Sequence, residues 1–249
     1  MTFIYNTPLL NINIPKVPFR ANPNVYSPAF TPPDDRFSTN PFLDGLENKA
    51  VLTQMAKSNP KIMKILKEND IPLNIDTSEL DKLKHGHLAD TRVTVAKMYS
   101  ALDKDLKENI NQSDLQQAAM LHDVGKAFIP DKILNKKGKL LPEERKIMDL
   151  HSELGYQLLK QKGVSDDVLR LVRYHHQDSS GGGYPKADKD FVYDIPAQML
   201  KAADKYSALT EKRSYKDALS KDEALEVMRN DVDSGLIAPE VYNALEKSV

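Results

Sequence analysis

The chain has 249 residues and a formal net charge of −1, and hydrophobic residues make up 40% of it. This length fits one domain with a short appendage, and this hydrophobic content is enough for a buried core. A nearly neutral chain has no overall field that would attract DNA, RNA or an anionic membrane surface. The absence of cysteine excludes disulfides, thiolate nucleophiles and cysteine-bound zinc, so histidine, aspartate and glutamate must hold any metal.

Neither a membrane span nor a secretion signal is evident in the sequence. No apolar run approaches the ~20 residues that a membrane-spanning helix requires. The first residues lack a basic n-region, and asparagine and proline interrupt their apolar stretch. A cysteine-free chain also fits a reducing compartment. We therefore expect a cytoplasmic protein that is not bound to a membrane.

The N-terminal segment, residues 1–45, differs in composition from the rest of the chain. Eight of the 15 prolines fall before residue 42, among many asparagine, serine and threonine residues. Proline removes a backbone donor and disfavours helix in the residue before it. We expect an irregular arm over 1–45, a linking helical segment over 46–76 and the main domain over 77–249. The arm either has no function or docks a protein partner. A further alternative is that the protein forms a homodimer through the arm.

The rest of the chain has the apolar spacing of helices and no convincing strand. Helical patterns cover residues 46–70 and 78–107. Ser113, Ser165 and Ser220 stand at expected helix starts, the first and last with capping-box spacing. Pro142 suits a first helical turn, and three glycines at 181–183 mark a loop. The prediction is an all-α fold, a bundle of helices around a central site.

All six histidines lie between positions 85 and 176, and two pairs stand out. His122 precedes Asp123 at the end of an apolar run, and His175 precedes His176 at the end of another helical pattern. Polar pairs at the ends of core-facing helices are costly unless something binds them. Imidazoles and carboxylates without thiolate suit zinc, manganese or iron. The alternative is a set of core and surface histidines that bind no metal.

A cluster of this kind can hold two metal ions, with a carboxylate such as that of Asp123 bridging them. Water shared by two metals loses its proton near neutral pH and becomes a nucleophile, and the metals neutralise charge on phosphate oxygens. This chemistry requires several histidines from different helices around one central aspartate. The pattern therefore indicates a metal site whose ions could support this chemistry.

Several segments in a fixed order resemble the HD-GYP domains, which belong to the HD superfamily of metal-dependent phosphohydrolases. Residues 122–126 read HDVGK, residues 129–140 read IPDKILNKKGKL, and residues 183–185 read GYP. Residues 203–210 read ADKYSALT and precede the segment RSYK at 213–216. The resemblance extends over residues 85–245 and holds in both order and spacing.

The resemblance implies an HD-domain helical bundle around a binuclear metal site. It implies a phosphodiesterase that hydrolyses a cyclic dinucleotide, chiefly cyclic di-GMP, to the linear dinucleotide or GMP. The two divalent ions would be iron or manganese, with zinc, nickel or cobalt as alternatives. The metal ligands carried over by position are His87, His122, Asp123, His151, His175, His176 and Asp204. The catalytic residues would be Asp123, which bridges the metals, and Lys126. The residues that contact substrate would be Lys126, Tyr184, Arg213 and Lys216.

Some of these assignments have alternatives. His85 could replace His87 as the first ligand, although the distance of His87 from His122 fits the family better. Leu83 stands where some relatives have a glutamate for a third metal, so we expect two metals. Lys126 could be a helix C-terminal cation instead of a phosphate ligand. Similarly, Tyr184 could be a packing residue, and the two basic residues of the RSYK segment could form a solvated face.

The chain departs from the family pattern around the GYP segment. Gln177 and Ser180 replace acidic residues, and Gly182 replaces a small hydroxyl residue. Ser207 stands where a second acid is usual, and Ser152 where proline is usual. Lost carboxylates around ligating imidazoles commonly weaken metal affinity or activity by ~10–100-fold. Alternative functions are therefore hydrolysis of another nucleotide or phosphate ester, and a binding or scaffolding module with little turnover.

Overall fold

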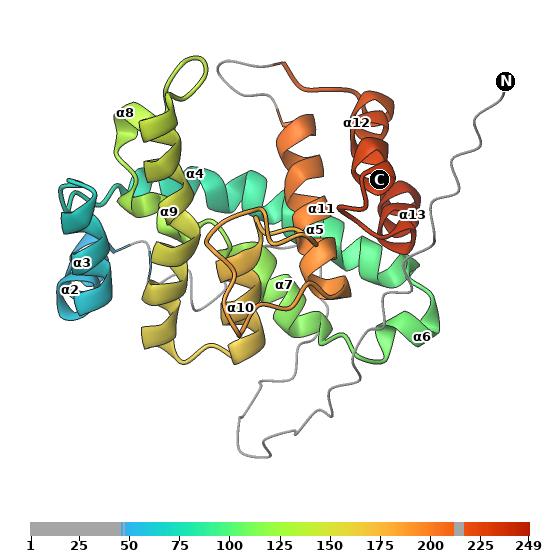
Figure 1. Ribbon diagram of the computed structural model, residues 1–249, viewed down its shortest axis with the longest axis horizontal. Coiled ribbons are helices and arrows are strands. Elements are labelled where there is room, and N and C mark those ends of the chain that lie inside the picture. Colours follow the sequence, from blue (N-terminus) through green and yellow to red (C-terminus); the bar gives the residue numbers. More distant parts are fainter. Residues whose placement is uncertain (1–45, 47, 212–216) are drawn as a thin grey trace, which may run out of the picture. The chain divides into compact units, whose positions relative to one another are not determined.

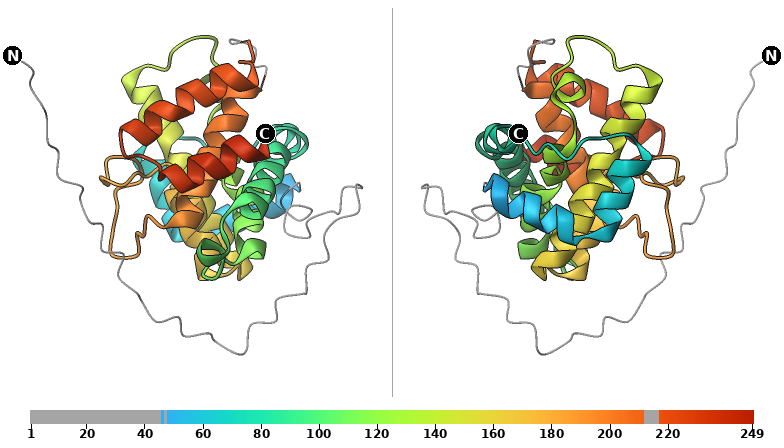
Figure 2. Two further views of the ribbon diagram at one scale, coloured as in Figure 1. Left: turned by 90° about the vertical axis from the view of Figure 1, so that its right-hand side faces the viewer. Right: turned by 90° about the vertical axis from the view of Figure 1, so that its left-hand side faces the viewer.

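The computed structural model describes residue 46 and residues 48–211 and 217–249, without the side chains of Glu79 and Lys84. In this part of the chain every regular element is a helix, as Figures 1 and 2 show. The predicted all-α fold is confirmed. The arm predicted over 1–45 lies outside the described residues.

The helices follow one another along the chain with short connections. The first six are α2 (Lys49–Ser58), α3 (Pro60–Glu68), α4 (Thr77–His85), α5 (His87–Ala101), α6 (Lys104–Lys107) and α7 (Gln112–Leu121). The next are the 3₁₀ turn η1 (Val124–Phe128), α8 (Asp131–Leu134), α9 (Pro142–Leu159) and the 3₁₀ turn η2 (Lys160–Lys162). The last are α10 (Asp166–Tyr174), α11 (Ile195–Thr210), α12 (Lys221–Asp233) and α13 (Pro239–Ser248). None of the helices in the described ranges is long and apolar enough to cross a membrane.

Both long helical patterns of the sequence are divided by residues that end helices. The pattern over 46–70 breaks at Asn59, whose side chain caps α3 and precedes a proline in its first turn. The pattern over 78–107 breaks at Gly86, between α4 and α5, and again at Leu102. The break at Gly86 matters most, because it makes His87 the first residue of α5.

Helix starts follow local capping chemistry, and one predicted start is wrong. Ser165 caps α10, and Ser220 forms a capping box at the start of α12. Pro142 is the first residue of α9. The predicted start at Ser113 is displaced, because Asn111 caps α7 and its side chain accepts the backbone N–H of Ser113 at 3.0 Å. Asparagine is as good an N-cap as serine, so the earlier residue takes the position.

A hydrophobic core connects the helices from α2 to α13. Leu52 of α2 and Ile62 of α3 are fully buried in it, together with Leu88 of α5 and Leu154 of α9. α5 packs against α7, α11 and α13, and α9 packs against η1 and α10. In Figure 1, α9, α10 and α11 run side by side while α5 crosses α11. The end of α7, the end of α10 and the start of α5 therefore meet between α9 and α11.

Candidate metal centre

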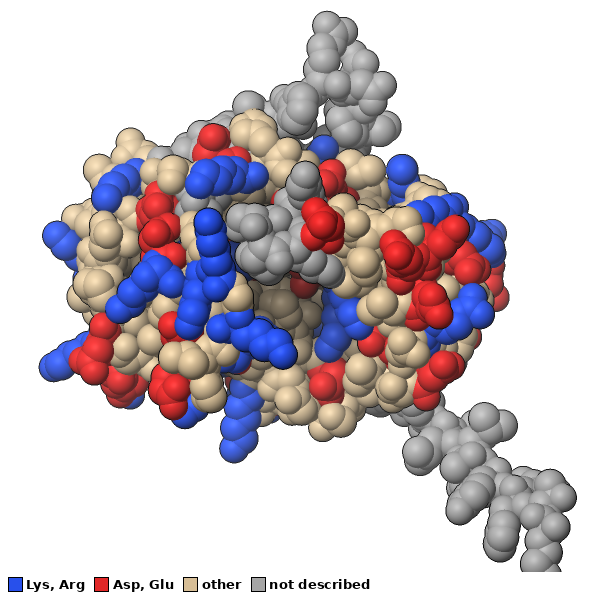
Figure 3. Space-filling view, turned by 90° about the horizontal axis from the view of Figure 1, so that it is seen from above, with Lys and Arg blue, Asp and Glu red and all other residues tan. Residues whose placement is uncertain are grey.

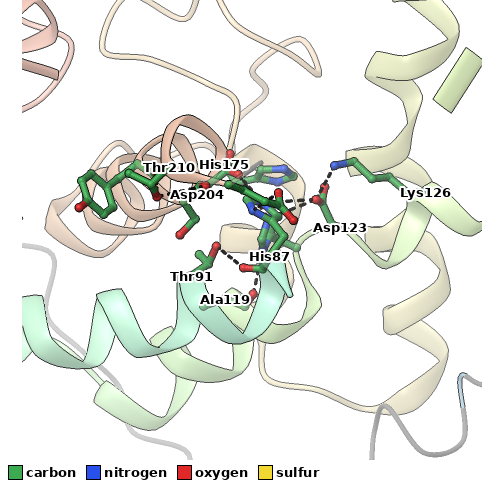
Figure 4. Close-up of polar contacts among 12 residues, drawn as sticks. His87, Thr91, Ala119, Asp123, Lys126, His175, Asp204 and Thr210 are labelled. Atoms are coloured by element: carbon green, nitrogen blue, oxygen red, sulfur yellow. Dashed lines mark hydrogen bonds and ion pairs between the residues drawn. The ribbon is translucent and has the colours of Figure 1, made fainter. Parts of the chain in front are cut away.

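Seven histidine and aspartate side chains come together where these helices meet. They come from the start of α5, the segment after α7, the middle of α9, the end of α10 and the middle of α11: His87, His122, Asp123, His151, His175, His176 and Asp204. Figure 4 shows His87, Asp123, His175 and Asp204 directed toward one another. The structure thus brings together all seven residues that the resemblance assigned as metal ligands.

The seven side chains form two neighbouring groups. Within each group, one potential ligand atom from each residue lies within 4.8 Å of the others. The first group, site A, is His87, His122 and Asp204, and the second, site B, is His151, His175 and His176. A further trio of His122, Asp123 and His175 overlaps with both groups and connects them.

Asp123 lies between site A and site B, and its side chain is only 1% exposed. Its Oδ2 is 3.5 Å from Nε2 of His122 and 3.8 Å from Nε2 of His87. Its Oδ1 is 3.3 Å from Nε2 of His151. Because the two oxygens face different sites, this carboxylate has the geometry that a bridge between two ions requires.

The backbones of three helices orient three of the imidazoles. Nδ1 of His122 lies 2.9 Å from the carbonyl oxygen of Ala119. Nδ1 of His151 lies 2.7 Å from that of Met148, and Nδ1 of His175 lies 2.7 Å from that of Val172. In each case the acceptor is three residues earlier in the chain. A neutral ring that donates from Nδ1 keeps the lone pair of Nε2 for a metal. These contacts therefore assign the tautomer that a metal ligand needs and fix the direction of the ring.

Burial keeps the imidazoles of site B neutral. It lowers the pKa of His151 to about 4 and the pKa of His176 to about 3. Burial also holds the pKa of His175 well below its usual range, and the other nearby imidazoles reinforce this effect. Because only a neutral imidazole can bind a metal, all three rings are in the binding form near neutral pH.

The two aspartates are ionised in spite of their burial. For Asp123, burial alone would raise the pKa, but Lys126 and the surrounding imidazoles outweigh it and hold the pKa well below its usual range. For Asp204, burial is likewise outweighed, here by the neighbouring His122 ring and by the hydrogen bond from His87, and the pKa is held well below its usual range. An ionised carboxylate is the form that binds a divalent cation.

The site also contains buried polar atoms that a cation would satisfy. Within the described residues, Nε2 of His122 and Oδ1 of Asp123 have no hydrogen-bond partner. An unsatisfied buried polar group costs about 1–3 kcal/mol. In addition, α7 and α10 both end at the site, so the negative ends of their dipoles face it. The donor set and these two features fit divalent metal ions with nitrogen and oxygen ligands.

His85 lies outside the cluster. It is the last residue of α4, its side chain is 57% exposed, and its Nε2 is 3.5 Å from Oδ1 of Asp81. The side chain of His87 is 2% exposed and belongs to site A. The structure thus places His87 rather than His85 among the candidate ligands. Leu83, which cannot ligate, packs partly buried against the hydrophobic core.

Two glycines let the chain pass directly against the ligand-bearing segments. A Cβ atom at Gly125 would lie 1.9 Å from the carbonyl oxygen of His151. One at Gly183 would lie 2.0 Å from the carbonyl oxygen of His176. No side chain fits at such distances from backbone atoms, so the glycines of the HDVGK and GYP segments are required for packing.

Two of the residues predicted to contact substrate adjoin the centre. Nζ of Lys126, on η1, is 2.5 Å from Oδ2 of Asp123, and Figure 4 shows this side chain reaching toward the carboxylate. The ring of Tyr184 is tilted by 31° over that of His176, with 4.6 Å between the centroids. The guanidinium of Arg145, a residue that sequence analysis missed, lies 5.8 Å from the centroid of the Tyr184 ring. The other two predicted residues, Arg213 and Lys216, lie outside the described residues.

Gln177 holds the loop that carries Tyr184. Its side chain is fully buried, its Oε1 accepts the backbone N–H of Gly183 at 3.1 Å, and its Nε2 donates to the carbonyl oxygen of Pro185 at 2.5 Å. These two backbone groups flank Tyr184 on either side. An ionised glutamate could accept the first hydrogen bond but could not donate the second. The sequence interpretation treated Gln177 as a lost carboxylate and missed this role.

The surface is hollowed on the face seen in Figure 3. Lys and Arg side chains gather along the side of this hollow on which α8 and α9 lie. The segment from η1 to the first turns of α9 contributes seven basic residues, each half-buried or exposed: Lys126, Lys132, Lys136, Lys137, Lys139, Arg145 and Lys146. Such a concentration of positive charge attracts anionic ligands.

A family model described as the HD domain matches residues 51–241. The chain belongs to the HD domain family. It is 30% identical over 155 residues to 3'3'-cGAMP-specific phosphodiesterase 1 of Vibrio cholerae, in a match that covers 62% of this chain and 36% of that protein. It is 35% identical over 144 residues to a cyclic di-GMP phosphodiesterase of Thermotoga maritima, which covers 55% of this chain and 38% of that protein. The chain thus spans little more than a third of the length of these relatives.

The fold also matches a solved structure, that of Bd1817, described as an HDG"Y"P protein from Bdellovibrio bacteriovorus. The TM-score is 0.54 at 18% sequence identity, and the match covers 82% of this chain and 65% of that one. At this identity the match shows the HD fold alone. Together with the match of the family model, it confirms the HD domain that the sequence resemblance predicted.

Proposed function

We propose that the protein is a metal-dependent phosphodiesterase that hydrolyses a cyclic dinucleotide, with cyclic di-GMP as the first substrate to test. The observation that carries this proposal is the position of Asp123, whose two oxygens face site A and site B separately. Relatives named as cyclic di-GMP and 3'3'-cGAMP phosphodiesterases support the substrate class. Hydrolysis would add water across one P–O ester bond and release a linear dinucleotide.

The residues of the two sites would hold one divalent ion each, with Asp123 between them. When bound, iron or manganese ions would activate water and neutralise charge on the phosphate oxygens. The chain's own contribution is to present neutral imidazoles and ionised carboxylates in fixed directions. The hydrogen bonds from Nδ1 of His122, His151 and His175 to backbone carbonyls do this before any ion arrives.

Substrate recognition would fall to the residues beside the centre. Lys126 is half-buried next to Asp123, where its ammonium group can hold a phosphate oxygen of the bound dinucleotide. Tyr184 presents its ring beside His176, where a nucleobase or ribose could pack against it. The basic side of the hollow would attract the two phosphates of the substrate. A role for Arg213 and Lys216 stays a prediction from the sequence.

The test is product analysis with protein reconstituted anaerobically with Fe(II) or Mn(II), beside an Asp123→Ala variant. The wild type should convert cyclic di-GMP, 3'3'-cGAMP or both to linear product, and the variant should lose activity by more than about 10³-fold, because several kcal/mol of metal assistance disappear. Metal analysis should give two ions per chain for the wild type. A wild type that binds two ions and leaves both cyclic dinucleotides intact would refute the proposed substrate class, and three bound ions would refute the count.

Other predictions from the sequence concern the setting of the enzyme. A cytoplasmic location, a homodimer and a docking role for residues 1–45 stay hypotheses, as does the domain boundary at residue 77. None of them is required for the proposed reaction, because the described residues alone supply both sites.

A further inference from the structure

We infer that Glu211 is a positioning residue for site A, where its carboxylate accepts the proton of His87 Nδ1 when Nε2 of that ring binds a metal. This inference rests on the proposed metal centre. It concerns a residue outside every motif that the sequence interpretation used. It follows from a difference between His87 and three other imidazoles of the cluster, those of His122, His151 and His175.

His87 has no orienting carbonyl in its own helix. The rings of His122, His151 and His175 donate to a carbonyl three residues earlier, but His87 is the first residue of α5 and follows the break at Gly86. Its Nδ1 is buried and, within the described residues, has no hydrogen-bond partner. Another acceptor is therefore needed to fix this ring.

Metal binding increases the need for an acceptor at Nδ1 of His87. Nε2 of His87 lies 2.9 Å from Oδ1 of Asp204, which suits a proton on Nε2. A metal takes the lone pair of Nε2, so the remaining proton of the neutral ring moves to Nδ1. A buried N–H without an acceptor is costly, so an acceptor close to Nδ1 would strengthen metal binding.

Glu211 is placed to supply this acceptor. It directly follows α11, the helix that carries Asp204, and its Oε2 is 3.9 Å from Nδ1 of His87. A movement of about 1 Å brings this pair to the ordinary hydrogen-bond distance. The side chain passes close to Gly86, since a Cβ there would lie 3.5 Å from Oε1. The negative charge also offsets the positive end of the α5 dipole, which otherwise opposes a cation at site A.

Ser207 offers an independent check of this geometry. It lies one helical turn before Glu211 on α11, and it stands where the sequence analysis noted the loss of an acid. It is 4% exposed, and its Oγ has no hydrogen-bond partner within the described residues. A carboxylate introduced here would come from the same helix face as that of Glu211. The variant Ser207→Asp should therefore replace Glu211 in part.

The experiment measures Mn²⁺ binding to the metal-free protein by competition with a chromogenic chelator. Glu211→Ala should weaken the binding of one of the two ions by ~10–100-fold and leave the binding of the other unchanged, because only site A loses a positioning residue. Glu211→Gln keeps an acceptor without the charge, so it should weaken the binding of the same ion less. Ser207→Asp in the Glu211→Ala background should recover most of the loss. Glu226→Ala, which removes an exposed carboxylate on α12, should change nothing.

The position of the proton gives a readout that a merely structural role would not move. In Zn²⁺-loaded, ¹⁵N-labelled protein, the His87 ring should show a hydrogen-bonded proton on Nδ1, and this signal should weaken in Glu211→Ala and return with Ser207→Asp. Wild-type affinity for both ions in Glu211→Ala and Glu211→Gln would overturn the inference, and so would equal weakening of both ions. Failure of the proposed function is distinguishable, because a wild type that hydrolyses no cyclic dinucleotide can still show these differences in affinity.

Discussion

The two candidate metal sites and the loop that carries Tyr184 are held in place by different kinds of contact. In the sites, the rings of His122, His151 and His175 are oriented by carbonyls of the helices to which they belong. In the loop, few contacts fix the chain: Gln177 spans the backbone on both sides of Tyr184, and Asp178 accepts the backbone N–H groups of nearby loop residues. The ligand geometry thus follows from helix formation, whereas the loop geometry depends on single side chains.

Under the proposed function, this difference would separate metal binding from substrate recognition. A substitution in the loop removes no hydrogen bond from the three helix-oriented rings. A substitution among the buried ligands changes the charge balance of the whole centre, because Asp123 interacts with Lys126 and with imidazoles of both sites. We therefore expect the departures of this chain from the HD-GYP pattern at 177–182 to affect substrate recognition more than metal binding. Three predictions test this separation.

The largest effect is expected on the stability of the metal-free protein in acid. The pKa of His151 is lowered to about 4 and that of His176 to about 3, so the unfolded chain, with pKa values near 6.5, binds more protons between these limits. The free energy of unfolding should therefore fall as the pH drops from about 6.5 toward 3, by several kcal/mol in total. Urea unfolding of metal-free protein at a series of pH values measures this.

Two histidine variants show whether the metal sites cause the loss. His151→Gln removes one of the buried titrating groups and should make the dependence on pH shallower. His85→Gln changes an exposed ring outside the cluster and should leave the dependence as it is. A stability that is constant from pH 6.5 to 4 would contradict the expectation.

A smaller loss is expected when the packing of η1 against α9 is disturbed. Gly125→Ala places a Cβ 1.9 Å from the carbonyl oxygen of His151, and neither backbone segment can yield easily. Overpacking of this kind costs about 3 kcal/mol. Urea unfolding should show this decrease together with weaker metal binding. Gly155→Ala, whose Cβ would come no closer than 3.3 Å to the backbone nitrogen of Gly125, should cost clearly less. Equal effects of the two variants would argue against a close approach at Gly125.

The smallest effect is expected in the loop. Gln177→Glu keeps the acceptor for Gly183 but replaces the donor to Pro185 by an oxygen, so Tyr184 loses one of its two flanking supports. The loss of about one hydrogen bond corresponds to a decrease of ~10-fold in kcat/KM for the cyclic dinucleotide, with the metal content unchanged. Steady-state kinetics and metal analysis measure both quantities. The exposed residue Gln161 provides a control, because Gln161→Glu should leave kcat/KM as it is. A loss of metal in Gln177→Glu would contradict the expectation that the loop and the candidate metal sites are held independently.

Local capping chemistry accounts for what the sequence predicted of the fold. Pro142, Ser165 and Ser220 start helices because proline at N1 and serine at the N-cap act within one turn. The predicted helix start at Ser113 was wrong for the same local reason, since Asn111 offers a side-chain acceptor two residues earlier. The choice among such neighbouring candidates depends on how the helix packs, which the local pattern does not contain.

The candidate site was predictable in composition but only partly in arrangement. The pairs His122-Asp123 and His175-His176 stood out from the residues alone, and the rest of the cluster came from the HD-GYP resemblance. Spacing left His85 open as an alternative to His87, and the break at Gly86 places His87 at the start of α5, beside the other candidate ligands. The role of Gln177 could not be predicted, because its partners lie six and eight residues further on in an irregular loop.

The orientation of ligands by their own helices also has a mechanical consequence. Because each of the rings of His122, His151 and His175 shares a rigid body with its acceptor, a small shift of α7, α9 or α10 moves a ligand atom without turning its ring. The spacing between ligands from different helices can therefore adapt to ions of different radius while every orienting hydrogen bond is kept. A metal centre built in this way would discriminate weakly by ion size, so the availability of ions would largely decide which metal fills it.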